Sequence, residues 1–271
     1  MHVLRSINLL IVGIFVLFIT VILTAPGHAK IDPGSVVGLW LIDENEDNIV
    51  PDVSGNGHDG AIKGNPEWDD GKFGDALKFH GGSDVVDCGN DEKLNLGKFT
   101  VSFWAKFPVT QGWNHIVSKG DHVTSGVPGS VNWGVMMRSA EARFLFEIYQ
   151  DTTWAGISSP AVPLDEWQHL AATYDGDRME FFLNGVSLGS SAGAKIKLDA
   201  SRSFLIGARA SVAPASYFNG SVDEVALFNE VLAVADIKNL MNLGIEDALN
   251  LIAVYPSGKS ATTWARIKDQ Y

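Results

Sequence analysis

The side chains best suited to acid–base chemistry in this sequence are carboxylates that occur as adjacent pairs. These pairs are Asp43-Glu44, Asp69-Asp70, Asp91-Glu92 and Asp223-Glu224. Glycoside hydrolysis requires two carboxyl groups that face each other across the scissile bond. Adjacent residues of a strand point to opposite faces, which excludes the first and last pairs, and the other two pairs fall in expected turns. The sequence therefore predicts no catalytic residues and a protein that is not an enzyme, with a glycoside hydrolase as the enzymatic alternative.

Histidine and cysteine form no pattern typical of a metal site or a nucleophile. The seven histidines include no His-Glu-x-x-His motif and no close Cys–His cluster, which excludes the common zinc sites. His58 lies in a glycine-rich turn and His169 alternates with Ala171 in an expected strand, so both are predicted to be structural. Cys88 is the single cysteine and lies in a short apolar strand pattern, where a buried free thiol is expected.

Tryptophan side chains are the remaining candidates for contact with a ligand, because sugar rings stack on aromatic faces. Trp113, Trp133 and Trp154 lie near expected loops or strand ends, and Trp104 lies opposite the apolar face of its strand. For any one of these rings, a place in the core or as cover for a sheet is the more common role. As a set, they are the predicted ligand-binding residues.

The elements that must position these side chains are expected to be strands, because the sequence consists largely of short apolar runs separated by glycine-rich turns. Val101, Phe103, Ala105 and Phe107 share one face of an expected strand, as alternation requires. Asn184-Gly185 is typical of a two-residue type I′ hairpin turn. Expected strands cover 36–42, 100–107, 167–174, 178–183, 186–188, 203–207 and 220–228. One helix is expected from Ala233 to Leu240, and its start lacks a hydroxyl cap.

The segment from Asp52 to Gly60 is predicted to be a structural turn. Asp52 and Ser54 can accept hydrogen bonds from nearby backbone N–H groups, and Gly55, Asn56 and Gly57 can supply positive φ angles. We therefore expect this turn to be needed for folding and not for binding.

Three motifs, found in the order in which the family has them, resemble the laminin-G-like, concanavalin A-like lectin/glucanase family. They are Asp52–Gly60, Trp167–Gly176 and Phe218–Val225, and the resemblance extends from about Val36 to Leu240. It implies an all-β fold, a two-sheet antiparallel jelly-roll sandwich. It further implies a binding scaffold, either a module for carbohydrate or extracellular matrix polymers or a structural or adhesion domain that contacts proteins.

The resemblance also implies a structural calcium ion between the first and last strands. Asp43 and Asp223 would be its side-chain ligands, and backbone carbonyls would complete the shell. Oxygen-only ligands suit calcium better than zinc. The alternative is that Asp223 only accepts hydrogen bonds from the backbone of a neighbouring loop, and the sequence leaves both open.

The first 29 residues have the layout of a secretory signal peptide. Arg5 precedes an apolar run from Leu9 to Leu23, and Gly27 and Ala29 offer a small-residue cleavage site. An uncleaved membrane anchor is the alternative. The remaining chain divides into a domain of residues 30–240 and a tail of residues 241–271 that packs back on the sandwich. The domain is expected to be secreted, extracellular or periplasmic, and in contact with a membrane only if the segment stays attached.

Charge narrows the range of partners. Without residues 1–29 the chain has 19 basic and 32 acidic residues. This excess of acidic residues argues against binding to nucleic acid, which requires a basic face on the protein. It favours the binding of divalent cations. The expected partner is a glycan or an extracellular protein.

Overall fold

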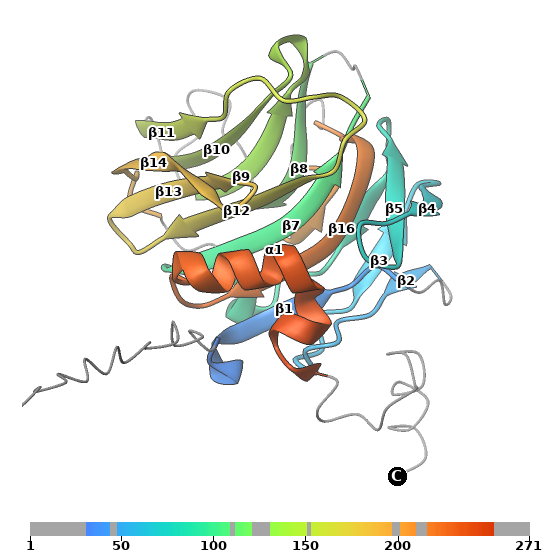
Figure 1. The fold of residues 1–271 in the computed structure, drawn as a ribbon, viewed down its shortest axis with the longest axis horizontal. Coiled ribbons are helices and arrows are strands. Elements are labelled where there is room, and N and C mark those ends of the chain that lie inside the picture. The colour runs from blue at the N-terminus through green and yellow to red at the C-terminus, as the bar shows by residue number, and fades with distance from the viewer. Residues whose placement is uncertain are drawn as a thin grey trace, which may run out of the picture.

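Two antiparallel sheets of eight strands each stack face to face (Figure 1). The structure is a computed structural model that describes residues 31–43, 48–108, 112–120, 131–150, 153–196, 201–209 and 216–251. The predicted all-β, two-sheet antiparallel sandwich is confirmed. The expected signal segment and residues 252–271 of the expected tail lie outside the described residues.

The first sheet, sheet A, contains the first and last strands of the chain side by side. Its order is β14 (Val186–Ala192), β13 (Arg178–Leu183), β12 (Gln168–Tyr174), β7 (Phe99–Lys106), β16 (Asn219–Phe228), β5 (Asp75–His80) and β4 (Glu67–Asp70), and β1 (Val36–Trp40) also pairs with β16. The β1–β16 pairing joins segments almost two hundred residues apart, with Trp40 opposite Val225.

The second sheet, sheet B, is built from the remaining strands. Its order is β11 (Thr153–Ser158), β10 (Arg143–Gln150), β9 (Val131–Arg138), β8 (Trp113–Lys119), β15 (Phe204–Ile206), β6 (Val85–Asp87), β3 (Gly60–Lys63) and β2 (Ile49–Val50). In the described part of the chain, three short 3₁₀ turns accompany the strands: η1 (Pro33–Ser35), η2 (Glu92–Leu94) and η3 (Ser139–Glu141).

Side chains that alternate along the strands fill the space between the sheets. Val101, Phe103 and Ala105 of β7 point into this core, as predicted. The hairpin between β13 and β14 has Asn184 at φ 50° and Gly185 at φ 71°, the two positive angles that a type I′ turn requires. Cys88 is buried in the same core, and burial raises the pKa of its thiol well above the usual range. The expected buried, free thiol is therefore confirmed.

Among the described residues, one helical element, α1 (Val234–Ala248), covers the outer face of sheet A, and its backbone is kinked at Gly244 (φ 78°, ψ 170°) (Figure 1). Ile237, Leu240 and Ile245 pack there on a second apolar cluster that includes Phe182 and Phe228. The regular helix continues a few residues past the predicted end at Leu240 and is interrupted at Gly244, after which a short second segment packs Ile245 on the same cluster. Within the described ranges, no helix is both long and apolar enough to span a bilayer.

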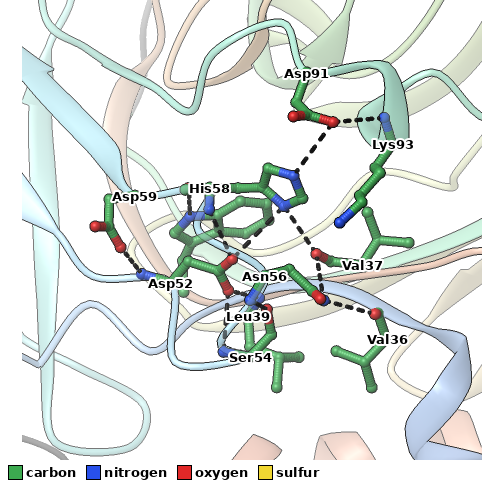
Figure 2. Close-up of polar contacts among 11 residues, drawn as sticks. Val36, Val37, Leu39, Asp52, Ser54, Asn56, His58, Asp59, Asp91 and Lys93 are labelled. Atoms are coloured by element: carbon green, nitrogen blue, oxygen red, sulfur yellow. Dashed lines mark hydrogen bonds and ion pairs between the residues drawn. The ribbon is translucent and has the colours of Figure 1, made fainter. Parts of the chain in front are cut away.

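The segment of residues 52–60, here called the Asp52 loop, ties β1 to sheet B (Figure 2). The Asp52 carboxylate accepts hydrogen bonds from the backbone N–H groups of Leu39, Ser54 and His58, each at 3.0 Å. The His58 carbonyl accepts a hydrogen bond from the Trp40 indole at 2.8 Å. These contacts are internal to the fold, as expected for a structural turn.

One detail of the Asp52 loop differs from expectation. Gly55 and Gly57 have φ angles of 80° and 83°, as predicted, but Asn56 is not among the residues with positive φ. Its side-chain amide instead donates to the carbonyls of Val36 and Val37, at 2.9 and 3.1 Å. Asn56 therefore acts through its side chain, which bridges to β1, and not through its backbone conformation.

Candidate functional site

The four tryptophans predicted to bind a ligand divide into two buried and two exposed rings. Trp133 is 3% exposed and Trp104 is 6% exposed, whereas Trp113 is 53% and Trp154 is 51% exposed. A ring that stacks on a sugar must present a free face to solvent. Only Trp113 and Trp154 meet this condition.

The two buried tryptophans have protein on their ring faces. Trp133 points into the core and stacks on Phe99, with ring centroids 4.4 Å apart. Trp104 lies on the outer face of sheet A, in edge contact with Phe73 and His169 and beneath the Lys72 ammonium at 4.6 Å. These contacts correct the expectation for both residues, because neither ring has a face left for a ligand.

Trp154 stands on the outer face of sheet B, where β10 and β11 pair. Its indole lies over Gly156, where a Cβ atom would come within 2.5 Å of the ring. Its Nε1 donates to Glu147 Oε2 at 3.4 Å. The glycine thus leaves room for the flat indole and the carboxylate fixes its direction, so that one half of the ring faces solvent.

Glu147 is a buried carboxyl group whose oxygens require polar partners. His115 on β8 supplies one, with Nε2 at 3.1 Å from Glu147 Oε1 and both side chains almost fully buried. The His115 ring lies over Gly134, where a Cβ would approach it to 2.9 Å. An ion pair or hydrogen bond across strands at this depth is rigid, since breaking it would leave a buried polar group unsatisfied. Glu147 and His115 therefore position Trp154.

The sequence reasoning missed Glu147 and His115. The available signal was a single acid within the otherwise apolar run Phe144-Leu-Phe-Glu-Ile148. An acid in such a run needs a partner, but no spacing rule connects it to His115, which lies 32 residues earlier on another strand.

Trp113 occupies a distant part of the same outer face. The Arg138 guanidinium lies 4.4 Å from the centre of its ring, and Glu141 holds that guanidinium at 2.7 Å. In the strand register, Trp113 of β8 lies opposite Arg138 of β9, and Arg138 lies opposite Arg143 at the start of β10. Trp154 of β11 lies opposite Tyr149, near the other end of β10. The six residues from Arg143 to Tyr149 span about 20 Å of strand. The structure therefore places both exposed rings on one face without bringing them into one cluster.

A second polar cluster lies on the outer face of sheet A, where the structure brings Asp43 and Asp223 to the same turn. This β4–β5 turn (residues 71–74) is held from both sides. Asp223 Oδ2 accepts hydrogen bonds from the N–H groups of Lys72 and Phe73, at 2.7 and 3.0 Å, and Asp43 Oδ1 accepts from Asp75 N–H at 2.8 Å. The loop-anchoring alternative for Asp223 is thus observed for one of its two oxygens.

Glu224 joins these two carboxylates, contrary to expectation. The alternation rule placed Asp223 and Glu224 on opposite faces, but a bulge between Asp223 and Ala226 and a φ of 56° at Glu224 interrupt the alternation. Val222 and Val225 both point into the core, and Glu224 Oε2 accepts a hydrogen bond from Ile245 N–H in helix α1. Both acidic side chains therefore lie on the outer face, buried beneath the β4–β5 turn and the helix.

Burial and the neighbouring carboxyl groups disfavour ionisation of this cluster. Burial, followed by the charge of Asp43, raises the pKa of Asp223 to about 8, and burial with the charges of Asp223 and Asp43 raises the pKa of Glu224 to about 8. Asp223 Oδ1 is buried and has no hydrogen-bond partner among the described residues. Such an orphaned oxygen is explained by an ion or a water molecule.

The side chains alone do not complete a metal site. Within the described ranges, no group of three or more acidic, histidine or cysteine side chains has an arrangement ready to hold a metal ion. A hard cation at Asp223 Oδ1 would therefore need backbone carbonyls or water for the rest of its shell, which is common for calcium.

His169 is a buried histidine beside Trp104. Its Nε2 lies 2.9 Å from Ser102 Oγ, and burial lowers the pKa of the ring to about 3. The unfolded chain takes up a proton at this residue below pH ~6.5, whereas the folded chain does not until about 3. Acidification between these values therefore favours unfolding, by up to about 1.4 kcal/mol per pH unit.

We accordingly expect His169→Gln to flatten the loss of stability on acidification, because glutamine does not titrate. Urea unfolding of both proteins between neutral pH and about pH 4 measures the two slopes. Equal slopes would show that His169 is protonated in the folded protein too.

Comparisons with known proteins place the chain among lectin-like sandwiches. A family model described as the concanavalin A-like lectin/glucanases superfamily matches residues 80–238, more than half of the chain. No curated protein matches the sequence significantly. The structure is similar to domain 4 of AbnA, a GH43 extracellular arabinanase from Geobacillus stearothermophilus, in complex with arabinotriose, with a TM-score of 0.61 and 19% identity over 77% of this chain and 98% of that one.

Two further similar structures are parts of larger chains. One is a mutant of Trypanosoma rangeli sialidase that displays trans-sialidase activity, with a TM-score of 0.60 and 17% identity over 82% of this chain and 34% of the sialidase. The other is the binding domain of botulinum neurotoxin DC in complex with SialylT, with a TM-score of 0.57 and 15% identity over 78% of this chain and 51% of that chain. At these identities the similarity shows the fold alone.

Proposed function

The chain belongs to the concanavalin A-like lectin/glucanases superfamily, and we propose that it is a secreted, non-catalytic module that binds carbohydrate. The observation that carries this proposal is the half-exposed Trp154 ring, fixed flat over Gly156 by the buried Glu147. A ring held in this way stacks on a sugar without first losing conformational entropy. Two of the similar structures hold arabinotriose and SialylT, which supports a glycan as the ligand.

Two observations support a role without catalysis. The two Glu147 oxygens lie within hydrogen-bond distance of His115 and of the Trp154 indole. Asp223 and Glu224 share a face, but they are buried beneath a turn and a helix. Neither arrangement offers two carboxyl groups to an approaching glycosidic bond. The signal-peptide pattern around Arg5, Gly27 and Ala29 supports secretion.

We further propose that a structural calcium ion binds beside Asp223 Oδ1, with Asp43 and Glu224 as the other candidate side-chain ligands. A divalent cation would offset the clustered negative charge and would satisfy the orphaned oxygen. Its role would be to join β1, β16 and the β4–β5 turn, and it would supply no chemistry.

Replacing Trp154 by alanine tests the glycan site. On an array of plant, microbial and animal glycans, the wild-type chain is expected to bind a defined set, and Trp154→Ala is expected to bind that set at least about tenfold more weakly. Loss of the stacking ring is the reason, and an unchanged melting temperature would show that the fold is intact.

Val186→Ala is the matched control, because Val186 is exposed on β14 of the other sheet and its loss should not affect binding. Absence of any glycan binding by the wild-type chain, with capture of an extracellular protein instead, would favour the adhesion alternative. Release of shorter sugars from a bound polysaccharide would identify a hydrolase.

A further inference from the structure

We infer that buried water binds on the outer face of sheet A and joins Asp223, Trp104 and His169 through hydrogen bonds. These residues lie opposite one another on three neighbouring strands, β16, β7 and β12. All three residues are buried, with exposed fractions of 0% for Asp223, 6% for Trp104 and 1% for His169. The row lies on the other sheet from Trp154, so it is separate from the proposed glycan site.

Each residue of the row has one polar atom without a hydrogen-bond partner among the described residues. These atoms are Asp223 Oδ1, Trp104 Nε1 and His169 Nδ1. The second oxygen of Asp223 is held by the β4–β5 turn, and His169 Nε2 lies 2.9 Å from Ser102 Oγ. Buried polar groups in proteins almost always have a partner, so three orphaned atoms at successive positions of one row point to a shared ligand.

The β4–β5 turn and helix α1 close over this row. Phe73 of the turn lies in edge contact with the Trp104 ring, and the Lys72 ammonium lies 4.6 Å from the centre of that ring. The helix meets the turn where an added Cβ atom at Gly244 would lie 3.3 Å from the Phe73 ring. The three orphaned atoms have almost no contact with solvent. A ligand that reaches them is therefore enclosed by the protein.

The chemistry of the row restricts this ligand to a small neutral molecule that both donates and accepts hydrogen bonds. The Trp104 indole N–H can only donate, so a cation does not satisfy it. An anion would lie beside the carboxyl groups of Asp43, Asp223 and Glu224. His169 does not offset them, because burial lowers the pKa of its ring to about 3 and the ring is uncharged at neutral pH. Water meets the requirement, and buried water typically has about three polar partners.

Water fits the row whichever tautomer His169 adopts. Nδ1 accepts a hydrogen bond when Nε2 carries the proton and donates one when Nδ1 carries it, and water can serve in both cases. Neighbouring strands lie about 4.8 Å apart, so the row spans roughly 10 Å and two water molecules can bridge it. Calcium beside Asp223 Oδ1 would leave the Trp104 N–H without a partner. The inference therefore stands with or without that ion.

Magnetisation transfer from water to the indole hydrogens tests the inference in solution. Nuclear Overhauser spectra of purified, isotope-labelled residues 30–271 are expected to show a cross-peak between water and the indole hydrogen of Trp104, which is assigned by its loss in Trp104→Phe. Spectra in the laboratory and rotating frames distinguish bound water from hydrogen exchange. The same cross-peak in Ser102→Ala excludes the serine hydroxyl as its source.

Trp40 is the matched control, because it is also buried and its Nε1 already donates to the His58 carbonyl at 2.8 Å. No cross-peak with water is expected for its indole hydrogen. A crystal structure is expected in addition to show a water molecule at about 2.7–3.2 Å from Trp104 Nε1 and from Asp223 Oδ1 or His169 Nδ1, both in calcium and in chelator.

Three results would overturn the inference. The first is a crystal structure in which Trp104 Nε1 bonds directly to Asp223 or His169, and the second is one with an ion in place of the water. The third is the absence of the cross-peak at Trp104, or a cross-peak of equal strength at Trp40, which would show that water enters the whole interior.

Discussion

Replacing Asp52 by alanine is expected to lower the free energy of unfolding by about 3–5 kcal/mol. The Asp52 side chain is fully buried and accepts the backbone N–H groups of Leu39, Ser54 and His58 (Figure 2). Alanine would leave these donors without partners, and each buried, unsatisfied donor costs about 1–3 kcal/mol. The loss would also release β1 from the loop, since the N–H of Leu39 belongs to that strand. Equilibrium unfolding in urea measures the effect.

Asp59→Ala is the matched control from the same loop. Asp59 is exposed and accepts one hydrogen bond, from Asp52 N–H at 2.8 Å, so its replacement should cost no more than about 1 kcal/mol. An Asp52→Ala variant with normal stability and no glycan binding would reverse the structural assignment of the loop.

Much of the fold was predictable because local signals agreed with one another. Asn184-Gly185 has the residue types that a type I′ turn needs, and the alternation in β7 assigned Val101 and Phe103 to the core. The second, short helical segment after Gly244 was not predictable in this way. Burial of Ile245 on sheet A stabilises it, a tertiary contact that propensity does not encode.

The candidate site was predictable only in part, because face assignments depend on register. Trp133 lies in the same alternation as Val135 and Met137, and this shared parity places it in the core. The face on which Glu224 lies was not predictable, because a bulge adds one residue to the strand and reverses which residues point inward. The positive φ angle of Glu224 that accompanies the bulge has no signal in the sequence. Contacts such as Glu147–His115 join separate strands and become visible only in the fold.

Calcium is expected to raise the thermal stability of the protein. An ion bound only by the folded state stabilises it by about 2.7 kcal/mol when free calcium is a hundredfold above its dissociation constant. For a chain of this size the midpoint would rise by roughly 5–10 °C. The comparison is thermal unfolding of purified residues 30–271 in excess calcium and in excess chelator, with magnesium as a second cation.

The variants must distinguish an ion ligand from a loop anchor, because Asp223 can be both. Its Oδ2 holds the N–H groups of Lys72 and Phe73, so Asp223→Ala should lower the midpoint even in chelator. The decisive quantity is therefore the difference between calcium and chelator within each protein. This difference should vanish in Asp223→Ala and shrink in Asp43→Asn and Glu224→Gln, since each of the latter changes removes one charge and keeps the shape of the side chain. A wild-type midpoint that does not respond to calcium, or an equal response in Asp223→Ala, would leave Asp223 as an anchor of the β4–β5 turn alone.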